Sequence, residues 1–329
     1  MPRLSLRSGP FYGHRGKPKK GEESGACRVF PYRLPGRGYT YFSRFLCTNR
    51  FMIGIIKRKV IYTSICYKVI YTSTCYWLNR IGSIMIGSIM YEPRVYRQTC
   101  KSEDLVPFSV MVRETDLFIL AEKNFQEEAK RATLNCRAAL EEYIEQNPAF
   151  LTSLQPLPDD HEAPAIVASM IQASRKANVG PMAAVAGAVA EFVGLELLNL
   201  SKQVIVENGG DIFLSSSKKR MVRIFAGKSP FSNRIALEIE PEWSPLGVCT
   251  SSGTVGHSLS FGKADAVVII SPSAILADAA ATAVGNAVQT KADIDQALAL
   301  AEAIEGVEGA IIIKDNRAGF WGKVKIKRA

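Results

Sequence analysis

Six short apolar segments between residues 203 and 271 constrain the fold of this chain more than any other feature of its sequence. They read QVIVEN, DIFLSS, MVRIFAG, RIALEIE, LGVCTS and ADAVVIIS, with turn-forming residues between them. Most of the gaps are too short for the crossover helix that parallel neighbouring strands need. The segments therefore predict an antiparallel sheet.

Helical patterns lie on both sides of these segments. Residues 124–146 place apolar side chains on one face of a helix, which Asn147-Pro148 ends. Further helices are expected from about Pro164, over 180–198, and in SAILADAAATAVGNAV and DIDQALALAEAIEG, with strands in 108–122 and in the C-terminal segments GAIIIK and FWGKVKIK. The expected fold class is α+β, an antiparallel sheet covered by helices.

The first 89 residues differ from the rest of the chain in charge and in pattern. They hold 16 Lys and Arg residues against two acidic ones, whereas the remainder has a net charge of −4. VIYTSICYK is followed at once by VIYTSTCYW, and IGSIM by IGSIM, periods that match no repeat architecture. We therefore expect 1–89 to be a largely unstructured extension, disordered or translated from upstream sequence, with the natural start at Met90 and one domain over 90–329.

Nothing in the extension indicates a membrane or a nucleic acid as partner. Its apolar runs, FMIGII and IGSIMIGSIM, are shorter than the ~18 residues of a spanning helix. It contains no compact signal peptide, and its basic residues show no helical or repeat spacing. We expect a cytoplasmic protein that binds neither membranes nor nucleic acid.

The segment VIVENGGDIFL contains a turn at residues 208–211 that allows two interpretations. Asn-Gly and Gly-Asp are strong hairpin signals, so the turn can be purely structural. Gly209 and Gly210 would also let a ligand approach main-chain amides closely, and the carboxylates of Glu207 and Asp211 flank that opening. These carboxylates could accept hydrogen bonds from ribose hydroxyls or ring NH groups, or help to bind a metal.

The segment VCTSSGTVGHSLSFGKADAVVII, residues 248–270, is rich in hydroxyl groups and glycine. Hydroxyl and amide donors in such a loop are suited to phosphate oxygens. The candidate donors are Ser251, Ser252, Gly253 and Thr254. His257 could donate to a phosphate or transfer a proton, or it could be a structural hydrogen-bonding residue.

The helix predicted over 273–286 contains a possible pair of metal ligands. Asp278 and Thr282 are four residues apart, which puts both oxygens on one helix face. A carboxylate and a hydroxyl suit Mg²⁺, with water or phosphate as the other ligands. The alternative is that Thr282 bonds to a helix carbonyl while Asp278 faces solvent.

Taken together and in order, these segments resemble one known family. MYEPRVYR, GPMAAVAGAVAEFVG, VIVENGGDIFL, CTSSGTVGHSLSFGKADAV and ADAAATAVGN are similar to uncharacterised protein family 0280, a branch of the ApbE-like superfamily of flavin transferases. The resemblance covers 90–329 and none of 1–89. It implies an ApbE-like fold for 90–329, with antiparallel sheet and helices.

The resemblance also implies roles for the motifs. In flavin transferases a GGD turn contacts the flavin nucleotide, which corresponds to 209–211 here, and a TSG-like segment near the phosphates corresponds to Thr250–Gly253. An AD-x-x-x-T helix that binds Mg²⁺ places the metal on Asp278 and Thr282. The implied cofactors are FAD or FMN and Mg²⁺. The implied partners are a nucleotide-like small molecule and an acceptor protein. Whether the protein also forms a homo-oligomer stays open.

Three functions stay open at this point. The first is a Mg²⁺-dependent FAD:protein FMN transferase or phosphoryl transferase with His257 as catalytic residue. The second is a flavin- or nucleotide-binding protein without catalysis, and the third is a structural or assembly protein. The transferase motif continues with Asp-Pro and Thr-Gly after its histidine, whereas this chain reads HSLSFGKADA, which favours the second function. Asp278 and Thr282 favour the first.

Overall fold

The computed structural model describes residues 30–32, 40–42, 97, 102–254 and 260–329. The chain divides into two units, residues 1–56 and 57–329. In the first unit, strands β1 (Phe30–Tyr32) and β2 (Thr40–Phe42) pair antiparallel. The prediction of an unstructured extension falls largely on residues outside the described ranges, and so does the expected start at Met90.

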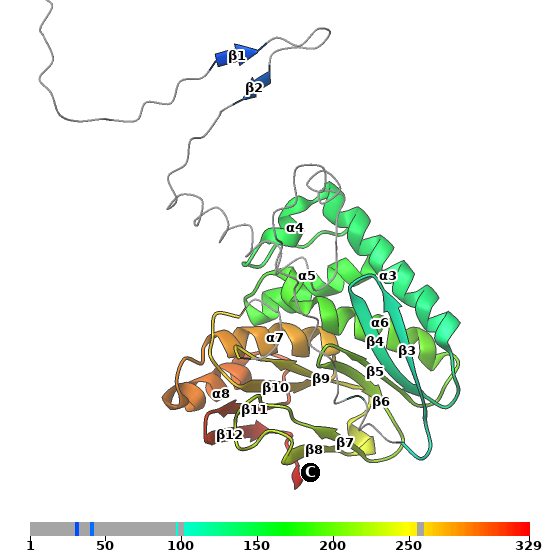
Figure 1. The fold of residues 1–329 in the computed structure, drawn as a ribbon, viewed down its shortest axis with the longest axis vertical. Helices are drawn as coiled ribbons and strands as arrows, with labels where there is room; N and C mark the ends of the chain where they lie inside the picture. Colours follow the sequence, from blue (N-terminus) through cyan, green and yellow to red (C-terminus); the bar gives the residue numbers. More distant parts are fainter. Residues whose placement is uncertain (1–29, 33–39, 43–96, 98–101, 255–259) are drawn as a thin grey trace, which may run out of the picture. The chain divides into compact units, whose positions relative to one another are not determined.

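An eight-stranded antiparallel sheet runs through the second unit in the order β12-β11-β10-β9-β6-β5-β4-β3 (Figure 1). Its strands are β3 (Val106–Val112), β4 (Thr115–Ala121), β5 (Val204–Asn208), β6 (Asp211–Ser215), β9 (Leu246–Ser251), β10 (Ala266–Ser271), β11 (Gly309–Lys314) and β12 (Arg317–Gly322). Tight hairpins join β3 to β4, β5 to β6 and β11 to β12. These short turns make strands that follow one another in sequence neighbours in the sheet.

Helices cover one face of this sheet. They are α3 (Gln126–Gln146), α4 (Pro148–Thr152), α5 (Ala165–Ala177), α6 (Val185–Leu198), α7 (Ala274–Asn286) and α8 (Ile294–Ala303). α6 packs on β5 and β6, α7 on β9 and β10, and α8 on β11 and β12. Val267 and Ile269 of β10 pack toward the helices, whereas Val268 and Ile270 pack on the other side, as the strand period of two requires. The predicted fold class is confirmed.

A second sheet covers part of the opposite face. It has the order β13-β8-β7, formed by β7 (Arg220–Arg223), β8 (Ile235–Ile239) and β13 (Ile326–Arg328). Leu237 and Ile239 pack against Val248 and Val268 of the large sheet. This second sheet adds to the predicted fold, because both faces of the central strands are apolar and each needs a covering layer. MVRIFAG and RIALEIE supply that layer, and FWGKVKIK is divided between β12 and β13.

The small residues before β5 form a buried helix, as the sequence predicts. A 3₁₀ turn (Pro181–Ala184) leads directly into α6. Pro181–Leu198 is the one described segment long and apolar enough to span a membrane, and 67% of it is buried inside the protein. Gly194 lies against the ring of Phe213 and Gly187 against Ala274. The missing side chains at these two glycines let α6 lie close to the sheet and to α7.

Candidate functional site

The turn between β5 and β6 is a two-residue hairpin loop. Asn208 and Asp211 are the paired residues on its two sides. Gly209 and Gly210 have φ values of 68° and 103°. Positive φ at both central residues is typical of a type I′ turn and favours glycine. Among the described atoms, the nearest to a Cβ on Gly210 would be the Cβ of Thr250, at 4.0 Å, so the turn lies beside the end of β9.

Glu207 holds this turn in place. Its Oε1 accepts a hydrogen bond from the N–H of Gly210 at 2.8 Å, and its Oε2 accepts one from Nε of Arg97 at 2.6 Å. Arg97 also donates to the carboxylate of Asp116 at 2.8 Å and lies over the ring of Phe118. Both oxygens of Glu207 are thus used within the protein. Sequence reasoning missed Arg97 and Asp116, although Arg97 lies in the MYEPRVYR motif.

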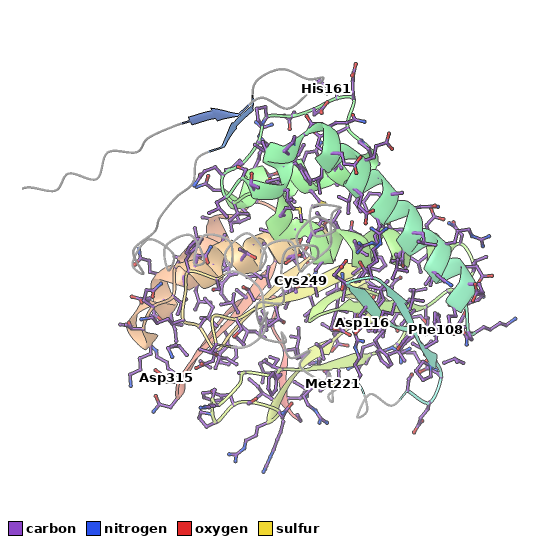
Figure 2. The ribbon with its side chains drawn as sticks, turned by 45° about the horizontal axis from the view of Figure 1, so that its top comes forward. Phe108, Asp116, His161, Met221, Cys249 and Asp315 are labelled. Carbon is purple, nitrogen blue, oxygen red and sulfur yellow. The ribbon has the colours of Figure 1, made fainter. Side chains whose placement is uncertain are left out.

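Asp211 connects the turn to β9. It pairs with Cys249 in the sheet, and its Oδ1 accepts from the N–H of Thr250 at 3.3 Å. Only 2% of Asp211 is exposed. Cys249 is fully buried, and its Sγ donates to the carbonyl of Ala274 on α7 (Figure 2). Met221 on β7, by contrast, is half exposed. The acidic end of the predicted GGD turn therefore lies directly against the predicted TSSG segment.

Two hydroxyl groups of the 250–254 segment make hydrogen bonds within the loop itself. Ser252 Oγ accepts from the N–H of Thr254 at 3.1 Å, and Thr254 Oγ1 donates to Oδ1 of Asp265 at 3.1 Å. The N–H of Gly253 donates to the carbonyl of Ala264 at 2.9 Å. These bonds set the start of the loop before any ligand is present.

Glycines fix how this loop meets α7. A Cβ on Gly253 would lie 2.1 Å from the carbonyl oxygen of Gly262, so no side chain fits between the two arms of the loop. Ser251 lies against Gly285 near the end of α7, with its Oγ 3.4 Å from where a Cβ on that glycine would stand. His257, the predicted catalytic residue, lies outside the described residues.

Asp278 is buried and bound to another helix. Its Oδ2 accepts hydrogen bonds from the N–H groups of Ala186 and Gly187, at 3.1 and 2.9 Å, and 2% of the residue is exposed. These amides belong to the first turn of α6, where main-chain N–H groups lack partners within the helix. Asp278 therefore caps α6 from α7. The alternative in which Asp278 faces solvent is wrong, because the α6–α7 contact covers it.

The same turn of α6 also reaches the glycine turn. Nδ2 of Asn208 donates to the carbonyl of Ala186 at 3.1 Å, so α6 contacts both Asn208 and Asp278. The structure thus links residues 208–211, Thr250, the start of α6 and Asp278 by hydrogen bonds at one end of the central strands β5, β6 and β9. Segments separated by up to about 90 residues in sequence meet there.

A carboxylate and a hydroxyl on α7, those of Asp278 and Thr282, are oxygen donors of the kind that Mg²⁺ prefers. The two amide bonds to Oδ2 orient the Asp278 carboxylate. Thr282 is half-buried one turn further along α7, and its hydroxyl makes no hydrogen bond in the part of the chain that is described. No group of three or more His, Cys, Asp or Glu side chains is close enough to hold a metal among the described residues. Mg²⁺ commonly binds through one or two protein oxygens plus phosphate and water.

A sequence model of the family described as "AbpE bacteria" matches residues 97–319. The chain belongs to this family. It is 42% identical to a UPF0280 protein of Methanococcus vannielii over 227 residues, which are 67% of this chain and 92% of the relative. It is 40% identical to a UPF0280 protein of Methanocaldococcus jannaschii over 221 residues, 65% of this chain and 90% of the relative. The predicted family resemblance is confirmed.

The solved structures that resemble this chain are more distant in sequence. The apo flavinyl transferase ApbE of Pseudomonas stutzeri is 14% identical to this chain, with a TM-score of 0.46 over 66% of this chain and 94% of that one. ApbE of Thermotoga maritima is 12% identical, with a TM-score of 0.41 over 68% and 97%.

Proposed function

We propose that this protein binds a flavin nucleotide, FAD or FMN, together with Mg²⁺. The binding site would lie at the strand ends formed by residues 208–211 and Thr250–Thr254, beside α7. The observation that carries the proposal is the set of hydrogen bonds that gathers these segments, Asp211 to Thr250 and both Asn208 and Asp278 to the first turn of α6. The flavin class comes from the resemblance of the GGD, TSSG and AD-x-x-x-T motifs to those of flavin transferases.

In this proposal each segment binds one part of the ligand. Asp278 and Thr282 hold Mg²⁺, which neutralises charge on the phosphates when it is bound. The hydroxyl of Ser251, near Gly285 at the end of α7, offers a donor to phosphate oxygens, whereas the N–H of Gly253 and the hydroxyl of Thr254 already donate within the loop and fix its shape. Gly209 and Gly210 let the nucleotide lie against main chain. Glu207 holds the turn rather than the ligand, because its two oxygens already accept bonds from Gly210 and Arg97.

The enzymatic form of the proposal is transfer of FMN from FAD to an acceptor protein. A hydroxyl of the acceptor attacks the phosphorus of the FMN half, the bond to the bridging oxygen breaks, and AMP leaves with that oxygen. The proton of the attacking hydroxyl goes to a base, for which His257 is the candidate. Binding without this step is the second function, and it forms neither AMP nor an FMN-modified acceptor.

Calorimetric titration of the protein with FAD, FMN and riboflavin, each with and without Mg²⁺, tests the proposal. FAD and FMN should bind, and Mg²⁺ should tighten their binding. Riboflavin has no phosphate, so it should bind more weakly and without dependence on Mg²⁺. Equal binding of all three ligands, or no binding of any, contradicts the proposal. Release of AMP together with covalent attachment of FMN to an acceptor protein, on incubation with FAD and Mg²⁺, would assign the transfer reaction, whereas AMP with free FMN would show hydrolysis.

A further inference from the structure

Helices α6 and α7 each bind the first turn of the other through a carboxylate. Asp278 of α7 accepts from the amides of Ala186 and Gly187 in α6. In return, Oε2 of Glu191 in α6 accepts from Oγ of Ser273 at 3.0 Å and from the N–H of Ile275 at 3.1 Å. Acidic groups are favourable at helix N-termini, where the amides and the helix dipole both attract them. The exchange therefore fixes the two helices against each other.

The contact between these helices leaves no room for adjustment. A Cβ on Gly187 would lie 2.2 Å from the carbonyl oxygen of Ala274, and a Cβ on Gly247 would lie 2.2 Å from its Cα. Ala274, the first residue of α7, is thus enclosed between α6 and β9. The start of α7 is closely packed, so a change in what holds Ser273 and Ile275 is transmitted along the helix to Asp278.

Glu191 is well placed to control this arrangement. It is the group that holds the start of α7, and Asp278 lies about one turn beyond that start on the same helix. Burial raises the pKa of Glu191, and the hydrogen bonds from Ile275 and Ser273 act in the opposite direction.

We infer that Glu191 is a positioning residue for the proposed magnesium site: by holding Ser273 and Ile275, it sets where Asp278 and Thr282 lie. Glu191 itself touches neither the metal nor the nucleotide. The inference rests on the proposed function, because it assigns to Glu191 the alignment of that site. Misplacing ligating oxygens by about 1 Å has large effects on such sites.

The binding test compares three variants with the unmodified protein in FAD titrations with and without Mg²⁺. Glu191→Ala should reduce the Mg²⁺-dependent gain in affinity by roughly tenfold and leave metal-free binding unchanged. Glu191→Gln keeps an oxygen that can accept both hydrogen bonds, so it should restore most of the gain. Glu196→Ala, an exposed glutamate on the same helix, is the matched control and should have no effect. An unchanged gain in Glu191→Ala, or equal loss in Glu191→Gln and Glu191→Ala, overturns the inference.

Amide hydrogen exchange of the free protein tests the positioning independently of any ligand. Glu191→Ala should accelerate exchange at Ile275, whose N–H loses its acceptor, and also at Ala186 and Gly187, because α7 carries Asp278 away from them. Faster exchange at Ile275 alone would contradict the inference, since the loss of the Glu191 carboxylate would then not change how Asp278 binds Ala186 and Gly187. If the unmodified protein binds no flavin nucleotide, the proposed function fails, and this exchange result still decides whether Glu191 positions Asp278.

Discussion

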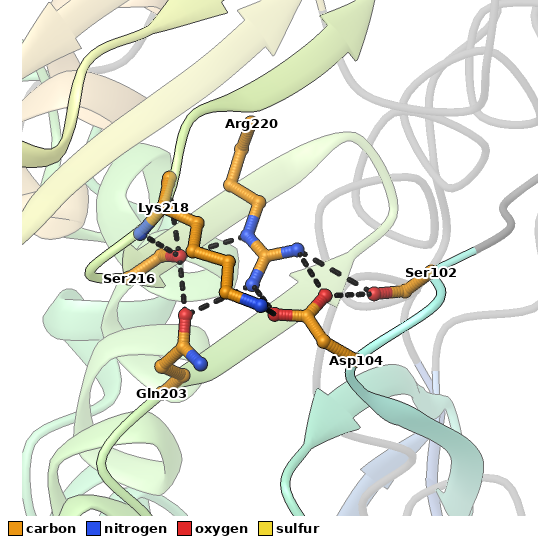
Figure 3. Close-up of polar contacts among 6 residues, drawn as sticks. All are labelled: Ser102, Asp104, Gln203, Ser216, Lys218 and Arg220. Carbon is orange, nitrogen blue, oxygen red and sulfur yellow. Dashed lines mark hydrogen bonds and ion pairs between the residues drawn. The ribbon is translucent and has the colours of Figure 1, made fainter.

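Two clusters of polar residues in this protein hold carboxylates in different ways. In one, Arg220 at the start of β7 binds both oxygens of Asp104 at 2.8 and 2.9 Å, with Ser102, Gln203, Ser216 and Lys218 around the pair (Figure 3). In the α6–α7 crossing, main-chain amides of one helix bind Asp278 of the other. The first carboxylate is held by a long side chain and the second by the backbone of a helix.

The difference affects how firmly each carboxylate is placed. Arg220 has to be ordered by its own neighbours, donating from Nε to Ser216 and from Nη2 to Gln203. Ala186 and Gly187 are ordered already because they belong to a buried helix. A carboxylate held by such amides is suited to a site that needs fixed geometry, whereas the Asp104 pair ties the 102–104 segment to the sheet. The predictions that follow test this contrast.

The largest effect is expected from Gly187→Ala. The new methyl group would lie 2.2 Å from a carbonyl oxygen of α7, so one helix must move. Such overpacking should lower the free energy of unfolding by about 3 kcal/mol. Gly194→Ala on the same helix meets the side chain of Phe213 instead, which can turn, and should cost less. Denaturant unfolding of both variants checks this, and equal stability losses would contradict the backbone contact.

Asp278→Ala should cost about 2 kcal/mol, because it removes the acceptor of two buried amides. Asp278→Asn keeps an oxygen in that position and should cost clearly less. Thermal unfolding of the two variants measures the difference. Equal melting temperatures for Asp278→Ala and the unmodified protein would show that Asp278 does not cap α6.

Local features of the fold could be predicted from the sequence better than contacts between distant segments. The hairpin at Gly209-Gly210 and the buried helix 185–198 follow from local turn chemistry and composition, and both were predicted. The separate β13-β8-β7 sheet was not, because MVRIFAG alternates like any strand and pairing partners are not encoded locally. The contacts of Asp278 and Glu191 also escaped prediction, since each depends on how two helices cross.

The motifs grouped Asp211, Thr250 and Asp278 as candidate site residues. The structure joins the segments that carry them by hydrogen bonds, and their role in a site stays a prediction. The role of Glu207 was less accessible: from sequence it flanks an open turn, whereas in the structure Arg97 occupies one of its oxygens. An arginine far away in the sequence that binds a carboxylate leaves no pattern in the segment around that carboxylate.

The ion pair of Asp104 should contribute less than the α6 cap and depend on pH. The Arg220 guanidinium holds the pKa of Asp104 well below its usual range, so the pair stabilises the fold above about pH 4 and loses that contribution as the pH falls further. Asp104→Asn should cost about 1 kcal/mol at pH 7 and less at pH 3.

Asp295 supplies the matched control for this pair. It also binds an arginine through two oxygens, Arg317 at 3.0 and 2.8 Å, but its side chain is 74% exposed. Asp295→Asn should therefore change stability little at either pH. Urea unfolding of both variants at pH 7 and pH 3 measures this, and a loss for Asp104→Asn as large at pH 3 as at pH 7 would contradict the electrostatic explanation.

The central claim, that backbone amides hold Asp278 ready for Mg²⁺, is tested most directly by FAD titration calorimetry with and without Mg²⁺ on the unmodified protein and Asp278→Asn. The substitution keeps the size of the side chain and an acceptor for the amides of Ala186 and Gly187, but removes its negative charge. We predict that Mg²⁺ tightens FAD binding to the unmodified protein and has no effect on Asp278→Asn, with both proteins folded. The same Mg²⁺-dependent gain in both proteins would contradict the claim.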